Sequence, residues 1–210
     1  MKICFVLGTR PEIIKLFPLI KLCTDEKIQY FIIHTGQHYS YMMDKKFFLD
    51  FNIKPKYILN REKSFITSTI DKISPIFLRE KPDYIINQGD TNTVLASALA
   101  CNKLSLNMID NKKFKLVHVE SGLRSHDKSM PEEINRIIAD QLSDILLVPT
   151  PESQKNLIKE NISKKKIYIV GNTISDSIKL NKKKINTNIL GNLKLRKKDY
   201  YLLTLHRPDM

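Results

Sequence analysis

The sequence has no apolar run that approaches the ~20 residues a membrane-spanning helix needs. Its start, MKICFVLGTRPE, combines one lysine with a short apolar run. It lacks the longer apolar stretch and the small-residue cleavage site of a signal peptide. We therefore expect no membrane partner, and we interpret the first apolar run as a core strand.

Cysteine is also scarce. The three cysteines, Cys4, Cys23 and Cys101, are widely spaced, and each lies in an apolar context. No CxxC or Cys/His pattern is present, so no zinc or other metal site is predicted. Isolated cysteines in apolar surroundings are typical of buried, reduced side chains, which predicts a cytoplasmic protein.

Acidic residues are few between positions 155 and 199, where only three accompany 13 Lys and Arg residues. This segment carries most of the formal net charge of +13. Such an excess can indicate nucleic-acid binding. However, the lysine runs lack the arginine clusters and interleaved aromatic residues of a nucleic-acid surface. We therefore expect a solvated, lysine-rich face and no nucleic-acid partner.

Short apolar runs alternate with longer amphipathic segments along the chain. The runs that we predict to be strands are 2–7, 30–35, 83–88, 115–120, 144–150, 166–171 and 200–206. Between them, apolar residues three and four positions apart predict helices. The strands are apolar on both faces, so helices should cover both sides of the sheet. We predict an α/β fold with a Rossmann-like, doubly wound, mostly parallel sheet.

The segment 181–199, NKKKINTNILGNLKLRKKD, is polar and poorly periodic. We predict that residues 1–180 form one Rossmann-like domain, that 181–199 form a linker, and that 200–210 begin a second Rossmann-like domain. The sequence stops a few residues after the last expected strand, with no helix to follow. We therefore expect the chain to be truncated.

Ligands bind at the carboxyl ends of the strands in a doubly wound sheet. After the first strand comes GTRPE, with Lys15 one turn into the following helix. A glycine turn at a helix N-terminus favours an anion, and Arg10 and Lys15 add charge suited to a diphosphate. The alternative is an ion pair between Arg10 and Glu12, with Lys15 in solvent. Neither a GxGxxG nor a Walker motif supports the site.

Polar residues also follow the next two strands. We interpret His34, inside its strand, as a core or rim group, and Gln37 and His38 as loop residues with functional potential only. Asp90 follows the strand 83–88. Its carboxylate either faces the cleft or caps the next helix.

The stretch VHVESGLRSHDKSMPEEINR gathers ionisable residues where a strand gives way to a helix. Glu120 ends the strand where the crevice should be. Glu132 and Glu133 open the helix, where the dipole favours negative charge, so a structural role is the alternative. Arg124 and Arg136 are candidates to neutralise these acids. The functional hypothesis is that these carboxylates form a cluster suited to acid/base chemistry on a sugar bonded to a nucleotide.

Together these segments resemble the non-hydrolysing UDP-N-acetylglucosamine 2-epimerases. The matching pieces are GTRPEIIKLFPLI, HTGQHY, QGDTNT, HVESGLRS, MPEEINR, GNTISD and LTLHRP, in the family's order and across nearly the whole chain. The resemblance implies the two-domain GT-B-type fold shared with many nucleotide-sugar transferases, of which this chain is the first half. It also implies a UDP-sugar substrate, a homodimer and a role in polysaccharide biosynthesis.

The implied reaction inverts C2 of UDP-GlcNAc to give UDP-ManNAc. UDP is eliminated across C1–C2, a glycal-type intermediate stays in the site, and UDP adds back after a proton returns on the other face. No NAD or other cofactor is consumed. Positive charge builds near C1 and the ring oxygen, where carboxylates stabilise it. Negative charge builds on the departing diphosphate, where Arg10 and Lys15 stabilise it.

By motif match, the resemblance implies as catalytic residues Asp90, Glu120, Glu132 and His206. It implies as substrate-binding residues Arg10, Lys15, Asp90, Glu120 and His206. Proton transfer at C2 is assigned to the carboxylates, and His206 lies near the phosphates. Motif position favours Glu132 over Glu133, and which carboxylate serves which face of C2 stays open.

Three alternatives remain. The chain could belong to a 2-epimerase for a UDP-diacetamido-uronic acid, to a glycosyltransferase of the same fold, or to a catalytically inactive fragment that only dimerises. Most of the family's second domain, which supplies the uracil and ribose contacts, is absent. We therefore expect the isolated chain to bind UDP-sugar poorly and to turn over little or not at all.

Overall fold

The structure is a computed structural model that describes residues 1–37, 45–106, 114–182 and 188–204. The chain divides into two compact units, Met1–Ser177 and Ile178–Met210. The first unit holds the sheet and the helices that cover it. The second holds the end of one helix, a short helix and irregular segments.

The sheet found in the described residues has seven strands in the order β3-β2-β1-β4-β5-β6-β7, and every neighbouring pair is parallel. The strands are β1 (Lys2–Leu7), β2 (Gln29–His34), β3 (Tyr57–Ile58), β4 (Tyr84–Gln88), β5 (Lys115–Val119), β6 (Ile145–Val148) and β7 (Ile167–Ile169). The predicted parallel sheet is confirmed. The two-residue β3 at its edge was not predicted, because so short a run has no periodicity to recognise.

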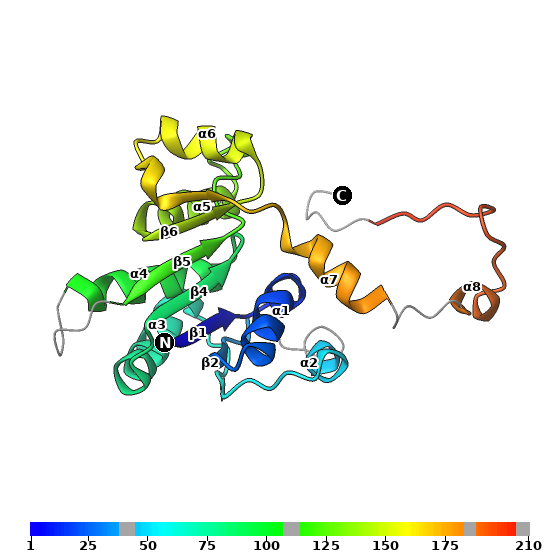
Figure 1. The fold of residues 1–210 in the computed structure, drawn as a ribbon, viewed down its shortest axis with the longest axis horizontal. Helices are drawn as coiled ribbons and strands as arrows, with labels where there is room; N and C mark the ends of the chain where they lie inside the picture. The colour runs from blue at the N-terminus through cyan, green and yellow to red at the C-terminus, as the bar shows by residue number, and fades with distance from the viewer. Residues whose placement is uncertain (38–44, 107–113, 183–187, 205–210) are drawn as a thin grey trace. The chain divides into compact units, whose positions relative to one another are not determined.

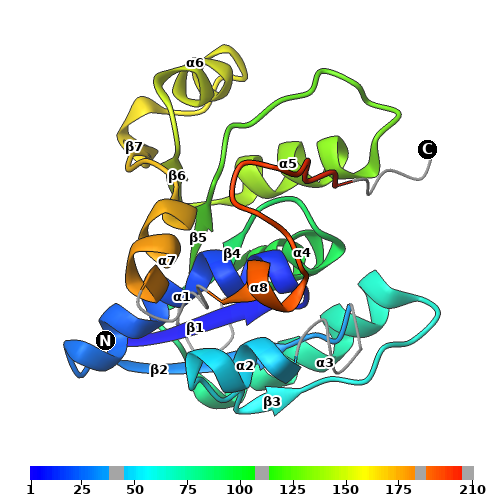
Figure 2. The ribbon, with the colours of Figure 1, turned by 90° about the vertical axis from the view of Figure 1, so that its right-hand side faces the viewer.

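Helices cover both faces of this sheet (Figure 1). They are α1 (Arg10–Asp25), α2 (Lys46–Phe51), α3 (Phe65–Glu80), α4 (Asn92–Leu106), α5 (Pro131–Leu142), α6 (Pro151–Lys159), α7 (Thr173–Asn181) and α8 (Ile189–Asn192), with a 3₁₀ turn η3 (Lys164–Lys166). α1 and α2 pack on one face, and α3, α4 and α5 pack on the other, as Figures 1 and 2 show. This is the doubly wound arrangement expected of strands that are apolar on both sides.

The alternation of side chains along β1 explains the two layers. Phe5 and Leu7 point to the layer of α1, and Cys4 and Val6 point to the layer of α3 and α4. All four side chains are fully buried. The predicted helix face is also confirmed, because the apolar positions of α1 at Ile13, Leu16, Phe17 and Ile20 are buried.

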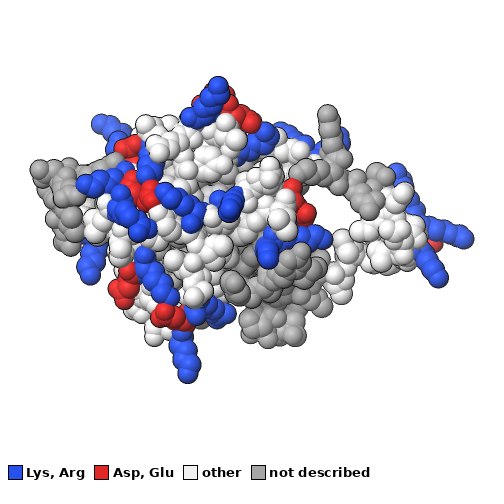
Figure 3. Space-filling view, turned by 90° about the horizontal axis from the view of Figure 1, so that it is seen from below, with Lys and Arg blue, Asp and Glu red and all other residues white. Residues whose placement is uncertain are grey.

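The three cysteines are buried and unbridged, as predicted. Lys164, Lys165 and Lys166 are exposed, which confirms a solvated lysine run. On the face shown in Figure 3, basic side chains are spread widely with acidic ones among them. Across the described residues, no helix has the length and apolar character needed to cross a membrane.

The last expected strand, 200–206, is not formed over the residues described. Residues 200–204 are irregular and exposed, and positions 205–206 lie outside the described residues. A strand is stable only where a neighbouring strand takes up its backbone N–H and C=O groups. That expectation is therefore wrong for 200–204, while the assignment of 200–210 to a second domain stays a prediction.

Candidate active site

The candidate site lies at the carboxyl edge of the sheet, around β1 and β4. The chain moves outward from β1 to β2 and β3, then returns to place β4 on the other side of β1. In doubly wound sheets the crevice that binds ligands lies where the strand order reverses in this way, here between β1 and β4. The loops after β5 and β7 reach the same edge because all of these strands are parallel.

The loop after β1 presents the amino end of α1 to this crevice. Thr9 precedes the helix in an extended conformation, and no side chain caps it. Pro11 occupies the first turn, where its missing N–H costs nothing. Arg10 begins the helix and is exposed. The helix dipole and the guanidinium together favour an anion here, and its assignment to a diphosphate stays a prediction.

Glu12 connects the loops after β1 and β4. Its buried carboxylate accepts hydrogen bonds from the Gly8 N–H (2.9 Å) and from the Thr91 hydroxyl (2.8 Å). Burial raises the pKa of Glu12 to about 7, although these hydrogen bonds oppose the shift. Sequence reasoning considered Glu12 only as a partner for Arg10 and did not foresee this bridge.

Lys15 and Glu120 form the central ion pair of the site. Lys15 Nζ donates to Glu120 Oε1 at 2.7 Å, and both side chains are largely buried. The amide of Asn172, in the loop after β7, donates to Glu120 Oε2 at 3.3 Å. The alternative of a solvated Lys15 is therefore wrong. Asn172 was not predicted as a site residue, although it lies within the matched segment GNTISD.

Asp90 pairs with Arg136 of α5. The amide of Asn135 also holds this loop, since it donates to the Asp90 carbonyl oxygen at 2.9 Å. The capping alternative for Asp90 is wrong, because the Thr91 hydroxyl accepts the hydrogen bond from the Val94 N–H near the start of α4 (3.3 Å). The Asp90 carboxylate thus lies at the carboxyl edge of the sheet and is paired with Arg136.

Glu132 and Glu133 are adjacent in sequence but differ completely in environment. The Glu133 carboxylate is buried and accepts from the Ser125 N–H (2.9 Å), the Ser125 hydroxyl (3.0 Å) and the His126 N–H (3.1 Å). Arg136 adds a further hydrogen bond at 3.1 Å. Burial raises the pKa of Glu133, but these bonds outweigh it and lower the pKa to about 2.

Glu132, by contrast, is exposed and has no hydrogen-bond or ion-pair partner among the described residues. Glu133 therefore takes the structural role, whereas the catalytic role of Glu132 stays a prediction. The two arginines also separate: Arg136 contacts Asp90 and Glu133, whereas Arg124 pairs with Asp140 and Glu160 outside this group.

His34 lies in the core, away from the candidate site. His34 is buried and packs edge-on against Phe48, with ring centroids 5.2 Å apart, and burial lowers its pKa to about 4. This confirms its interpretation as a core group. Gln37 accepts hydrogen bonds from the backbone N–H and the hydroxyl of Thr93, both at 3.0 Å. His38 and His206 lie outside the described residues.

Comparison with known proteins places these loops in a family. The family model described as UDP-N-acetylglucosamine 2-epimerase matches residues 20–210. The chain belongs to the UDP-N-acetylglucosamine 2-epimerase family. This confirms the resemblance carried by the seven sequence segments.

Individual relatives in the epimerase family agree. The chain is 45% identical to the UDP-N-acetylglucosamine 2-epimerase of Methanocaldococcus jannaschii, over all of this chain and 57% of the relative. The crystal structure of the Methanocaldococcus jannaschii enzyme in complex with UDP-GlcNAc and UDP matches with a TM-score of 0.84 and 45% identity, over 92% of this chain and 53% of that one. The fold is therefore the Rossmann-like half of a GT-B-type architecture.

The family also contains a related activity. The chain is 37% identical to the UDP-2,3-diacetamido-2,3-dideoxy-D-glucuronate 2-epimerase of Pseudomonas aeruginosa, over all of this chain and 58% of the relative. The chain spans a little over half the length of the curated relatives it matches.

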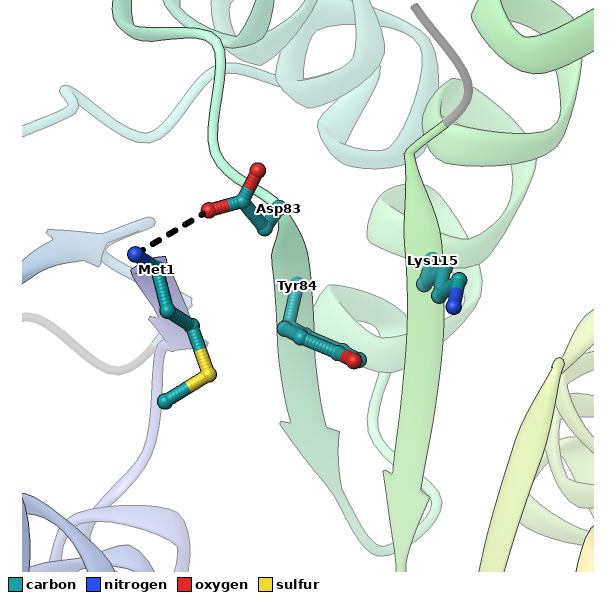
Figure 4. Close-up of a pocket in the computed structure, with 4 residues that line it drawn as sticks. All are labelled: Met1, Asp83, Tyr84 and Lys115. Atoms are coloured by element: carbon teal, nitrogen blue, oxygen red, sulfur yellow. Dashed lines mark ion pairs between the residues drawn. The ribbon is translucent and has the colours of Figure 1, made fainter.

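A depression of about 350 Å³ lies at the opposite, amino edge of the sheet (Figure 4). Met1, Asp83, Tyr84 and Lys115 line it, and the terminal amino group lies 3.8 Å from the Asp83 carboxylate. These residues begin β1, β4 and β5, so they lie at the other end of the strands from the epimerase motifs. The depression is therefore separate from the candidate active site.

Proposed function

We propose that this chain supplies the first half of a UDP-N-acetylglucosamine 2-epimerase, which interconverts UDP-GlcNAc and UDP-ManNAc through elimination and re-addition of UDP. The observation that carries the proposal is the Lys15–Glu120 ion pair. It joins the anion-binding end of α1 to a carboxylate at the carboxyl edge of the sheet. A cation and a carboxylate in contact are what a site needs when a sugar and its diphosphate separate as opposite charges.

The amino end of α1 and Arg10 would bind the diphosphate, and Lys15 would neutralise the charge that develops on it. Lys15 now contacts Glu120, so a bound phosphate would compete for its ammonium group. The Glu120 carboxylate would then lose its Lys15 partner and be free to act on the sugar. Binding of the diphosphate and release of this carboxylate would thus be coupled.

Three carboxylates serve the sugar in this proposal. Asp90 and Glu120 lie on the loops after β4 and β5, and Glu132 lies at the start of α5. Two would act on the C2 hydrogen from opposite faces, and the third would stabilise the positive charge at C1. His206 is retained from the family motif as the group near the phosphates.

The test is the epimerase reaction itself, run with the protein that carries this chain in heavy water. Epimerisation predicts UDP-ManNAc together with deuterium at C2 of recovered UDP-GlcNAc, both visible by proton NMR. Transfer of the sugar to an acceptor without deuterium at C2 would support a glycosyltransferase instead. Epimerisation of UDP-2,3-diacetamido-2,3-dideoxyglucuronate in preference to UDP-GlcNAc would move the substrate to the related activity.

Two further parts of the proposal concern the whole protein. We place it in the cytoplasm as a homodimer that serves polysaccharide biosynthesis. An antibody to residues 1–200 detects the protein in cell extract, and its polypeptide mass is measured under denaturing conditions. A mass near twice the 24.4 kDa of this chain supports a two-domain enzyme. A mass near 24.4 kDa without activity supports the inactive fragment, and gel filtration then shows whether it still dimerises.

A further inference from the structure

A fully buried histidine lies beneath the candidate active site. His118, in β5, has no exposed surface. Its Nε2 lies 2.8 Å from the carbonyl oxygen of Gly89, and its Nδ1 lies 2.7 Å from Asp140 Oδ1 in α5. A carbonyl oxygen can only accept a hydrogen bond, so Nε2 must carry a proton.

The other ring nitrogen faces an acceptor as well. Asp140 Oδ2 already accepts from the Gly122 N–H at 3.1 Å and from the Arg124 guanidinium at 2.7 Å. Those donors stabilise Asp140 as a carboxylate. If Nδ1 were unprotonated, its lone pair would meet an oxygen lone pair at hydrogen-bond distance. A proton therefore lies on Nδ1 too.

The charges form a balanced chain that runs from the buried His118 to the partly exposed Glu160. Arg124 donates to Glu160 through Nε and a terminal nitrogen at 2.7 and 2.6 Å, so two cations alternate with two anions from β5 to the end of α6. Burial alone would lower the pKa of Arg124, but Glu160 and Asp140 raise it well above its usual range. Pairing of this kind offsets the cost of desolvating each ion.

The two ends of the His118–Asp140 pair contact the two catalytic loops. Gly89 immediately precedes Asp90 and has a φ of +82°, and Gly122 follows Glu120 by two residues with a φ of +77°. Both turns adopt the left-handed conformation that favours glycine. His118 contacts the carbonyl group of Gly89, and Asp140 accepts a hydrogen bond from the N–H of Gly122.

We infer that His118 is a buried imidazolium that, with Asp140, positions the loops carrying Asp90 and Glu120. His118 is a positioning residue, since its ring contacts Gly89 and Asp140 and not the crevice itself. The inference rests on the proposed function only in naming Asp90 and Glu120 as catalytic residues. The protonation state and the loop contacts stand on the geometry alone.

The first experiment measures the ring nitrogens of His118 in the chain labelled with ¹⁵N-histidine. Their NMR shifts distinguish an imidazolium from either neutral tautomer. We expect the shifts of two protonated nitrogens, because each ring nitrogen faces an acceptor oxygen at hydrogen-bond distance. A neutral His118 ring at about pH 7 would overturn the inference.

The second experiment tests positioning with Asp140→Asn, which keeps the shape of the side chain and removes its charge. We expect the side-chain amide to donate to His118 Nδ1, which then carries no proton, while Nε2 keeps its own. The backbone amide signals of Asp90 and Gly122 should shift relative to wild type, whereas those of Gly36, in the loop after β2, should not. Loss of the Nδ1 proton with no shift at Asp90 or Gly122 would refute positioning.

His118→Gln is the second variant in case Asp140→Asn does not fold. It removes the imidazolium and leaves the Asp140 carboxylate without its charged donor, so the Gly122 amide signal should move. Unchanged Asp90 and Gly122 signals would again refute positioning. No substrate is present in these spectra, so a failure of the epimerase assay and a failure of this inference are separate results.

Discussion

Glu133→Gln is the substitution whose effect on stability follows most directly from the structure. The carboxylate of Glu133 fixes the loop after β5 through the backbone N–H groups of Ser125 and His126, and its pKa falls from 4.5 to about 2. A pKa shift of that size corresponds to a contribution of roughly 3 kcal/mol to the free energy of unfolding at neutral pH. Because the donors lie on an exposed loop that water solvates readily, we expect the variant to lose about 2 kcal/mol of unfolding free energy at neutral pH.

The sign of the pH dependence follows from the lowered pKa of Glu133. The stabilisation is fully present above the ordinary pKa of 4.5 and disappears as the pH falls toward 2. Urea unfolding free energies of wild type and variant should therefore differ at about pH 7, differ by less than half as much at about pH 3, and converge only below about pH 2. A difference that persists unchanged at low pH would show that lost packing, and not the charge, is responsible.

Glu132→Gln is the matched control, since it makes the same chemical change one residue earlier on an exposed side chain. We expect its unfolding free energy to stay within about 0.5 kcal/mol of wild type. If the proposed function is correct, this variant loses epimerisation in the protein that carries the chain. Equal stability of the two variants at neutral pH would refute the division of roles between these neighbours.

Three other substitutions test single features. Glu12→Gln removes a carboxyl group whose pKa is raised to about 7. Between about pH 5 and about pH 8, the unfolding free energy of wild type, measured in urea, should therefore fall by roughly 2 kcal/mol relative to that of the variant. Gly8→Ala places a Cβ against the hydroxyls of Thr35 and Thr93, and chemical denaturation should show a loss of about 1–3 kcal/mol. Glu80 accepts hydrogen bonds from two lysines and a tyrosine, which lower its pKa to about 2. In the same assay, Glu80→Gln should lower the unfolding free energy by about 1 kcal/mol at neutral pH and leave it unchanged by about pH 2.

The sheet and its layers could be predicted because they depend on local patterns. Alternating apolar runs and helical spacings are read within one segment, and the parallel sheet follows from their order. The short β3 and the irregular residues 200–204 could not be predicted in the same way. Whether a short run becomes a strand depends on a neighbouring strand elsewhere in the molecule.

The candidate site was predicted less completely, because its contacts join distant positions. Lys15 was assigned to the diphosphate and Glu120 to the sugar, yet the two side chains lie in contact. The helix dipole favours Glu132 and Glu133 equally, so local reasoning could not separate them. Nor did any local signal indicate that His118 meets Gly89 and Asp140.

The sequence by itself determined the family, the doubly wound fold and the loops that carry the chemistry, since each depends on the order and spacing of residues along the chain. The tertiary structure decided which charges meet: Lys15 with Glu120, Asp90 with Arg136, and Glu133 with its loop. The physical reason is that pairing and burial are properties of positions in space. Two adjacent glutamates have the same chemistry until the fold buries one and exposes the other.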